Sequence, residues 1–160
     1  MPGSTNKKVA VVRFDRESIK GFVNPRNYLL SEGVEVLSQS GSVLAIPYTE
    51  IKAVYFVREF LAEAPQAEPG VFLARPKMNG IWVRMRFRDG ELMDGVLPNN
   101  LLQLDPNGFG VMPPNPASNA QWVFVPRAAL LELDVLGVVG STLRPRKPKP
   151  KSKDQIELFE

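Results

Sequence analysis

The chain has neither cysteine nor histidine among its 160 residues. Without these side chains it offers no thiol nucleophile, no imidazole base and no ordinary zinc site. The sequence also lacks the GxxxxGK[ST] and GxGxxG loops that hold phosphates. We therefore predict a protein that is not an enzyme and that uses no metal and no cofactor.

Long apolar runs are missing as well. A membrane-spanning helix needs about 18 or more consecutive apolar residues, and the sequence contains no such run. The first residues, MPGSTNKK, lack the apolar segment of a secretory signal, which predicts a cytoplasmic location. With 44% hydrophobic residues, the chain can still bury a core of ordinary size.

Positive charge is concentrated near the C-terminal end. Of the 20 Lys and Arg residues, six lie between residues 141 and 153, and three of the 17 acidic residues follow them. Subtraction leaves 14 basic and 14 acidic side chains in the first 140 residues. Because the body is neutral overall, a wholly basic nucleic-acid-binding domain is not predicted.

Two segments occur twice in similar form. VVRFDRESIKGFV (11–23) resembles RMRFRDGELMDGVL (84–97), and LAIPYTEIKAVYFV (44–57) resembles VFVPRAALLELDVL (123–136). Aligned in this way, the offset between matched residues is 73 at Phe14, 74 at Gly21 and 79 at Pro47. An offset that grows only at turns indicates an internal duplication with loop insertions.

Both copies contain short alternating runs separated by turn residues, a pattern typical of antiparallel strands. Asp89-Gly90 between two such runs predicts a hairpin. Val34 to Leu37 and Leu101 to Leu104 are predicted as third strands. QWVFVP (121–126) is apolar on both faces and predicts a strand buried on two sides.

These patterns predict an all-β fold of two tandem small barrels. The predicted organisation is a first barrel at 7–57, a linker at 58–79, a second barrel at 80–140 and a disordered tail at 141–160. Phe60, Phe72 and Leu73 of the linker are expected to pack on one barrel or between both.

The order of the predicted elements resembles that of the Sm-like/SH3-like small barrel, here in tandem. The elements are a strand, an Asp-Gly turn, a strand that opens with Gly, a long bent strand and an Ile/Val-Pro step. RFRDGELMDGVLP, FVPRAAL and IPYTEIKAVYFV also resemble a bacterial domain family of unknown function. The resemblance covers about residues 7–140 and implies a fold rather than an activity. The Asp and Asn residues with which Sm proteins hold RNA bases have no match in NPRNYLL or PNNLLQL.

The strand IWVRMRFR (81–88) alternates between apolar and cationic side chains. Ile81, Val83, Met85 and Phe87 are predicted to face the core, and Trp82, Arg84, Arg86 and Arg88 the opposite side. Three guanidinium groups beside an indole are typical of a surface that binds phosphates and stacks a base. The alternative is a solvated strand face whose arginines pair with acids such as Glu91 and Asp94.

The tail segment RPRKPKPKSK (144–153) combines like charges with prolines and predicts an extended, unfolded tether. Its cations are expected to attract DNA or RNA phosphates; they are Arg144, Arg146, Lys147, Lys149, Lys151 and Lys153. A proline ligand for an SH3-type domain and a simple spacer are the alternatives.

Residues 155–159 of the tail, QIELF, resemble the motif by which bacterial replication and repair proteins bind the DNA sliding clamp. The resemblance implies that Gln155 enters a small polar pocket and that Ile156 makes an intermediate apolar contact. Leu158 and Phe159 would then fill a deep hydrophobic pocket. Two alternatives are an added strand on a barrel edge and an exposed segment with no partner.

The sequence therefore favours a non-enzymatic adaptor tethered to the bacterial sliding clamp in DNA replication or repair. One alternative is an Sm-like nucleic-acid-binding protein that uses the Arg/Trp face and the basic tail. The other is a small-molecule sensor, which needs an enclosed polar pocket.

Overall fold

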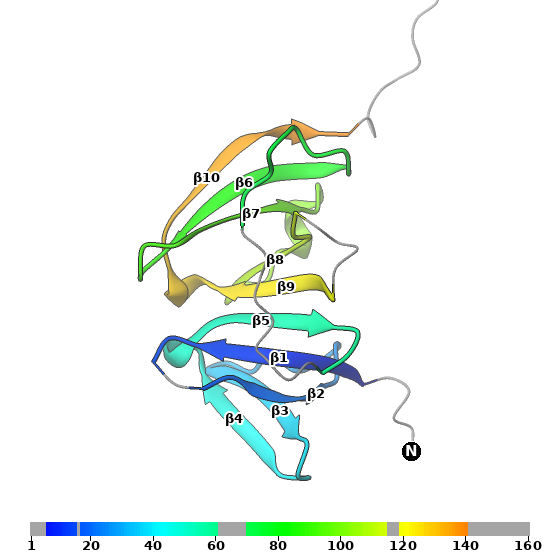
Figure 1. The fold of residues 1–160 in the computed structure, drawn as a ribbon, viewed down its shortest axis with the longest axis vertical. Coiled ribbons are helices and arrows are strands. Elements are labelled where there is room, and N and C mark those ends of the chain that lie inside the picture. Colours follow the sequence, from blue (N-terminus) through cyan, green and yellow to red (C-terminus); the bar gives the residue numbers. More distant parts are fainter. Residues whose placement is uncertain (1–5, 16, 61–69, 115–118, 141–160) are drawn as a thin grey trace, which may run out of the picture.

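The computed structural model describes residues 6–15, 17–60, 70–114 and 119–140. In these ranges the chain forms strands and short 3-10 turns but no α-helix, so the predicted all-β class is confirmed (Figure 1). None of the described helices is long and apolar enough to cross a membrane. The elements are β1 (Lys7–Arg13), β2 (Ile19–Val23), β3 (Gly33–Ser38), β4 (Val43–Pro47), η2 (Tyr48–Glu50), β5 (Ile51–Val57), β6 (Gly80–Phe87), β7 (Leu92–Leu97), η3 (Leu101–Gln103), β8 (Gly108–Val111), β9 (Ala120–Pro126), η4 (Arg127–Ala129) and β10 (Leu130–Val139).

The strands form two sheets with a repeated order. One sheet runs β4-β3-β2-β1-β5-β9-β8 and the other β10-β6-β7. A bridge between Val96 and Met112 brings β7 beside β8. Strands β6–β10, the second unit, therefore follow the neighbour order β9-β8-β7-β6-β10, which repeats the order β4-β3-β2-β1-β5 of the first unit, β1–β5. This arrangement is compatible with the predicted tandem barrels.

Pairing registers show how the two units correspond. Val9 lies opposite Gly21 in the first hairpin, and Val83 lies opposite Gly95 in the second. The offset is therefore 74 along both hairpin strands, and the predicted offset of 73 at Phe14 is wrong by one residue. The shared Arg-Phe dipeptide produced that error, because relative to the strand pairing it sits one position earlier in β6 than at the end of β1.

The same comparison holds for the last two strands of each unit. Gly33 lies opposite Pro47 and Gly108 opposite Pro126, so β4 and β9 correspond at an offset of 79. Strands β5 and β10 also correspond at 79, because β5 skips Lys52 and β10 skips Leu131 at the matching position of its pairing with the hairpin; β10 skips a second residue, Leu136, further along. The backbone pairing of the two units is therefore compatible with the predicted duplication.

One predicted strand is absent. Residues 101–103 form the 3-10 turn η3, and the third strand of the second unit is β8. The side chain of Asn100 accepts a hydrogen bond from the backbone N–H of Leu102 at 3.0 Å and so caps the turn. Leu102 is 94% exposed. The sequence pattern alone does not distinguish an exposed apolar pair in a turn from an apolar pair in a buried strand.

The apolar side chains form two cores that meet at β5. The first core lies inside the first unit, around Val9, Val11 and Val54, and it also contains Phe124 of the second unit. The second core combines Val83, Met85 and Phe87 of β6 with Val123 and Val125 of β9. The prediction that β9 is buried on both faces is confirmed.

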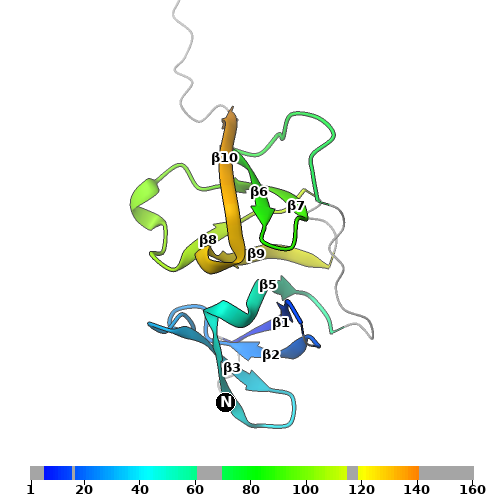
Figure 2. The same cartoon turned by 90° about the vertical axis from the view of Figure 1, so that its left-hand side faces the viewer.

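Strand β5 joins the units directly. It pairs antiparallel with β9, with Val54 opposite Phe124 and Tyr55 opposite Val123. Both views show the two strands side by side at the middle of the molecule (Figures 1 and 2). Ala53, Tyr55 and Val57 project from β5 into the second core, while Val54 projects into the first. Neither unit therefore has a complete core of its own.

The described part of the linker packs in two places. Phe60 lies edge-to-face against Phe22, with ring centroids 5.5 Å apart. Phe72 lies edge-to-face against Trp82 at 6.2 Å. Both agree with the predicted packing of the linker, but Leu73 is 97% exposed and that prediction is wrong.

Phe124 gives a test of the shared core. We expect Phe124→Ala to lower the free energy of unfolding by about 3–5 kcal/mol, because it opens a cavity between the rings of Tyr28 and Tyr48. Urea denaturation should show one transition for the whole body. The matched control, Leu102→Ala, removes an exposed side chain and should change stability by less than about 0.5 kcal/mol. A loss below about 1 kcal/mol for Phe124→Ala, or two separate transitions, would contradict the shared core.

Candidate functional site

Strand β6 places its side chains on the predicted sides. Val83, Met85 and Phe87 are buried in the second core. Trp82, Arg84 and Arg86 share the opposite side of the sheet, which we call the Arg/Trp face. The first-unit counterparts at an offset of 74 are Lys8, Ala10 and Val12, not the Val9 and Val11 that the offset of 73 indicates. Lys8 is exposed, but Ala10 is buried and Val12 packs against the second core, so two of the three counterparts carry no charge and are not open to solvent.

Asp94 is the centre of the Arg/Trp face. It lies opposite Arg84 in the hairpin and is fully buried. Arg84 donates from Nε to Oδ1 at 2.6 Å and from Nη2 to Oδ2 at 3.0 Å. The indole Nε1 of Trp82 and the backbone N–H of Phe72 donate to Oδ2 at 3.2 and 2.9 Å. This is the arginine–acid pairing that the sequence offered as the alternative to phosphate binding.

These contacts determine the protonation state of the Asp94 carboxyl group. Burial alone would raise the pKa of its carboxyl group, but the hydrogen bonds from Arg84, Phe72 and Trp82 outweigh burial and lower the pKa below its usual value. The same pairing raises the pKa of Arg84. Asp94 is therefore a carboxylate that holds Arg84 and Trp82 in fixed orientations.

Arg86 is the more available cation on this face. Its Nε lies 3.8 Å from Oε1 of Glu132 on β10, and both side chains are about half exposed. Such a surface pair contributes about 0–1 kcal/mol and opens at little cost. Arg86 is thus the residue of this face best able to meet an external anion.

Arg88 lies elsewhere, at the junction between the units. Its guanidinium group donates from Nη1 to the carbonyl oxygen of Ala128 at 3.1 Å and from Nη2 to that of Thr49 at 2.8 Å. It also stacks over the ring of Phe14, 3.9 Å from the centroid. Because Thr49 and Phe14 belong to the first unit, Arg88 ties the units together and does not join the Arg/Trp face.

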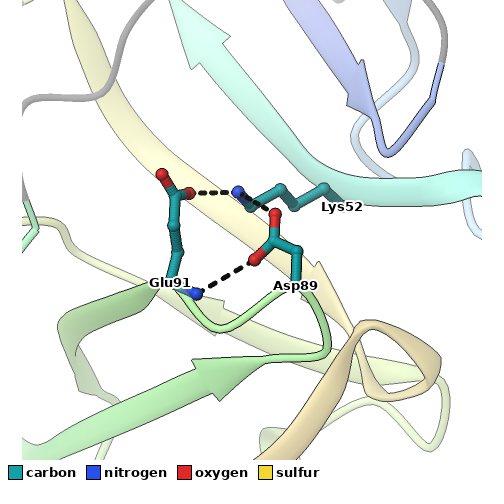
Figure 3. Close-up of polar contacts among 3 residues, drawn as sticks. All are labelled: Lys52, Asp89 and Glu91. Carbon is teal, nitrogen blue, oxygen red and sulfur yellow. Dashed lines mark hydrogen bonds and ion pairs between the residues drawn. The ribbon is translucent and has the colours of Figure 1, made fainter.

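A second polar contact at the junction involves Lys52, Asp89 and Glu91 (Figure 3). Lys52 of β5 reaches across to the β6–β7 turn, where its Nζ donates to Oδ2 of Asp89 at 2.8 Å and to Oε1 of Glu91. The N–H of Glu91 donates to Oδ1 of Asp89 at 3.0 Å and closes the group. The Lys52 ammonium also lies 5.0 Å from the ring centroid of Phe87.

The chemistry of Lys52 is that of a structural cation. Burial lowers the pKa of its ammonium group, but the hydrogen bonds to Asp89 and Glu91 outweigh burial and leave the pKa above its usual value. A lysine base or nucleophile needs the opposite shift. Sequence reasoning missed this residue, although a single cation inside the apolar run IKAVYFV was a usable signal.

The acidic residues form no further group of this kind: among the described residues, no three or more are placed together to hold a metal ion. The predicted clamp-binding residues and the six cations of the tether lie outside the described residues. The structure therefore describes the body, and the tail remains a prediction from sequence.

The buried carboxylate leads to a pH-dependent prediction. The pKa of Asp94 is lower in the folded chain than in the unfolded chain, where an Asp titrates near about 3.9. Its contribution to stability is therefore complete above about pH 4 and is lost as the pH falls through the folded-state pKa. We expect Asp94→Asn to lose about 2–3 kcal/mol at pH 7, because Arg84 and Trp82 lose a charged acceptor.

Measured by urea denaturation, the loss caused by Asp94→Asn should shrink between pH 5 and about pH 2. Glu35→Gln, at an exposed position of β3, is the control and should behave like the wild type at every pH. An equal loss at both ends of the pH range would show that Asp94 is not a stabilising carboxylate.

The junction contact can be tested with a double-mutant cycle between Lys52→Met and Asp89→Asn. Both partners are partly exposed to solvent, so we expect a coupling energy of about 0.5–1.5 kcal/mol at pH 7 and low salt. The coupling should fall in 1 M NaCl, because screening weakens the attraction. Independent effects of the two substitutions would contradict the contact in Figure 3.

Comparison with known proteins adds a family but no activity. The chain has no significant match among curated proteins and none among solved structures. A family model described as a family of unknown function, DUF6982, matches residues 5–137, which include every strand except the end of β10. With most of its length matched, the chain belongs to the DUF6982 family of unknown function.

Proposed function

We propose that this protein is a non-enzymatic adaptor whose C-terminal peptide binds the bacterial DNA sliding clamp during replication or repair. The observation that carries the proposal is QIELF at the end of a basic, proline-rich segment. In a charged segment, three large apolar side chains within five residues need a partner to cover them.

The peptide has the chemistry that clamp binding requires. An unfolded peptide must offset the entropy of becoming ordered, and a small number of deeply buried anchors does so. Leu158 and Phe159 supply two adjacent anchors, and Gln155 supplies a hydrogen-bonding side chain. Glu157 is expected to face solvent, so its charge is compatible with the bound state.

The body supports the adaptor proposal through the use of its charged groups. Arg84 and Arg88 are engaged in contacts within the chain, and Lys52 is held as a cation between two carboxylates. These contacts stabilise the fold and leave no activated nucleophile or base among them. The last described residue, Gly140, is exposed, and it follows β10 at the upper end of the body (Figure 1).

The tether has two expected roles. Ten residues of extended, proline-rich chain span about 30 Å, which separates the peptide from the body. Its lysines and arginines would add a salt-dependent attraction to DNA held by the clamp. The peptide would supply specificity, and the tether would supply reach and a weak contact to phosphates.

The test is a titration of the full chain against a purified bacterial sliding clamp by isothermal titration calorimetry. We expect a dissociation constant in the range of about 1–100 μM, and a loss of 10-fold or more for the double variant Gln155→Ala/Phe159→Ala. Glu157→Ala is the matched control and should bind like the wild type. Without DNA, affinity should change little between 0.1 and 0.5 M NaCl, because the anchors are apolar.

Two outcomes would refute the proposal. One is no heat of binding at about 200 μM clamp. The other is equal binding by the wild type and the double variant, which would mean that the clamp contacts a different part of the chain.

A further inference from the structure

In the described part of the chain, each of the two outermost strands of the body has an edge that pairs with no other strand. There β4 pairs only with β3 and β10 only with β6, and the Arg75 side chain donates to the carbonyl oxygen of Val138 near the end of β10. Val43 on β4 is 66% exposed and Val135 on β10 is 62% exposed. Strand β4 carries no charged residue that would block the approach of another strand. An apolar edge without such protection is a template for pairing.

The chain itself shows which strand fits such an edge. Strand β5 corresponds to β10, β9 corresponds to β4, and β5 and β9 are paired with each other at the junction between the units. The free edge of β10 is therefore the edge that β5 uses in the junction, and the free edge of β4 is the one that β9 uses.

The offset of 79 gives the register in which the free edges of β10 and β4 would pair. At the junction Val54 lies opposite Phe124, Tyr55 opposite Val123 and Phe56 opposite Trp122. The same pairing between β10 and β4 puts Leu133 opposite Ala45, Asp134 opposite Leu44 and Val135 opposite Val43. In this register the two exposed valines, Val43 and Val135, are direct partners, and the register follows from the β5–β9 pairing alone.

The positions of the edges determine which copies can meet. Strands β10 and β4 lie at the upper and lower ends of the molecule, so one chain cannot pair its own two edges (Figure 1). We propose that β10 pairs antiparallel with β4 of a second copy of this chain, with Val135 opposite Val43. The contact joins different surfaces on the two copies, so it is a head-to-tail interface that can continue to further copies.

Sequence differences make this interface weaker than the junction. Leu131 of β10 replaces Lys52, so the ion pairs of Figure 3 have no equivalent. Glu132 and Asp134 replace Ala53 and Tyr55, and Ala45 replaces Phe124. The contact retains the backbone hydrogen bonds and the apolar valine pair, and we expect reversible association with a dissociation constant of about 1 μM to 1 mM.

Sedimentation velocity of the full chain at about 10–500 μM tests the proposal. The wild type should shift towards dimers and longer species as its concentration rises. Val43→Lys and Val135→Lys should each remain monomeric, because a lysine blocks the edge. Each variant keeps one intact edge, so an equimolar mixture of the two should form a 1:1 dimer that does not grow further.

The rescue in the mixture separates this proposal from other modes of association. If β10 paired with a second β10, Val43→Lys would still associate and the mixture would show no rescue. Either result overturns the proposal, as does a wild type that stays monomeric at all concentrations. Leu102→Lys, at an exposed position on η3, is the control and should associate like the wild type.

Amide hydrogen exchange of the unmodified chain gives a second measurement that does not depend on the variants folding. Amides of both β4 and β10 should gain protection at high concentration, while those on exposed loops should not. Protection that is unchanged on either strand would also overturn the proposal.

Discussion

Strand β5 is the element on which the rest of the structure depends. Its two edges pair with β1 and β9, and its two faces belong to different cores. Ile51 and Val54 lie in the first core, and Ala53 lies in the second. Because a strand with both faces buried is apolar throughout, Lys52 is tolerated only where Asp89 and Glu91 compensate its charge. Separation of the units would expose one face of β5 and leave Lys52 without partners.

This dependence explains how two similar units came to differ. Position 55 of β5 holds a buried tyrosine, and the matching position 134 of β10 holds an exposed aspartate. Phe124 fills the first core, and its counterpart, Ala45, lies on a free edge. Each pair consists of an apolar residue at the junction and a smaller or polar residue at an end of the molecule. Burial at the junction therefore accounts for these sequence differences between the two units.

The sequence was most informative where a pattern is local. Alternation in β6 identified Val83, Met85 and Phe87 as core residues, and Asp89-Gly90 identified a hairpin in which Gly90 adopts a φ of 96°. The duplication was also recognisable, although the Arg-Phe dipeptide shifted one alignment by a residue. Such a shift exchanges the two faces of a strand, so Lys8, Ala10 and Val12 could be matched to the Arg/Trp face only from strand pairing.

Contacts between residues far apart in the sequence were harder to predict. Asp94 could be proposed as a partner of Arg84 because the hairpin puts them opposite each other. The contact of Arg88 with Thr49, and that of Lys52 with the β6–β7 turn, require knowledge of how the units dock. An arginine in an alternating strand has the same appearance whether it meets solvent, a phosphate or a backbone carbonyl. Only the packing of the units separates these cases.

Many polar groups of the body are used to hold its strands and its two units together. Several of its charged groups are occupied in holding β6 to β7 and the first unit to the second. A group that stabilises the fold in this way is not free to bind a ligand without a cost in stability. Among the described residues, the free edges of β4 and β10 and the loosely paired Arg86 do not have that obligation. The proposed adaptor function is compatible with this division, since internal contacts hold the body together while its two end strands remain open to partners.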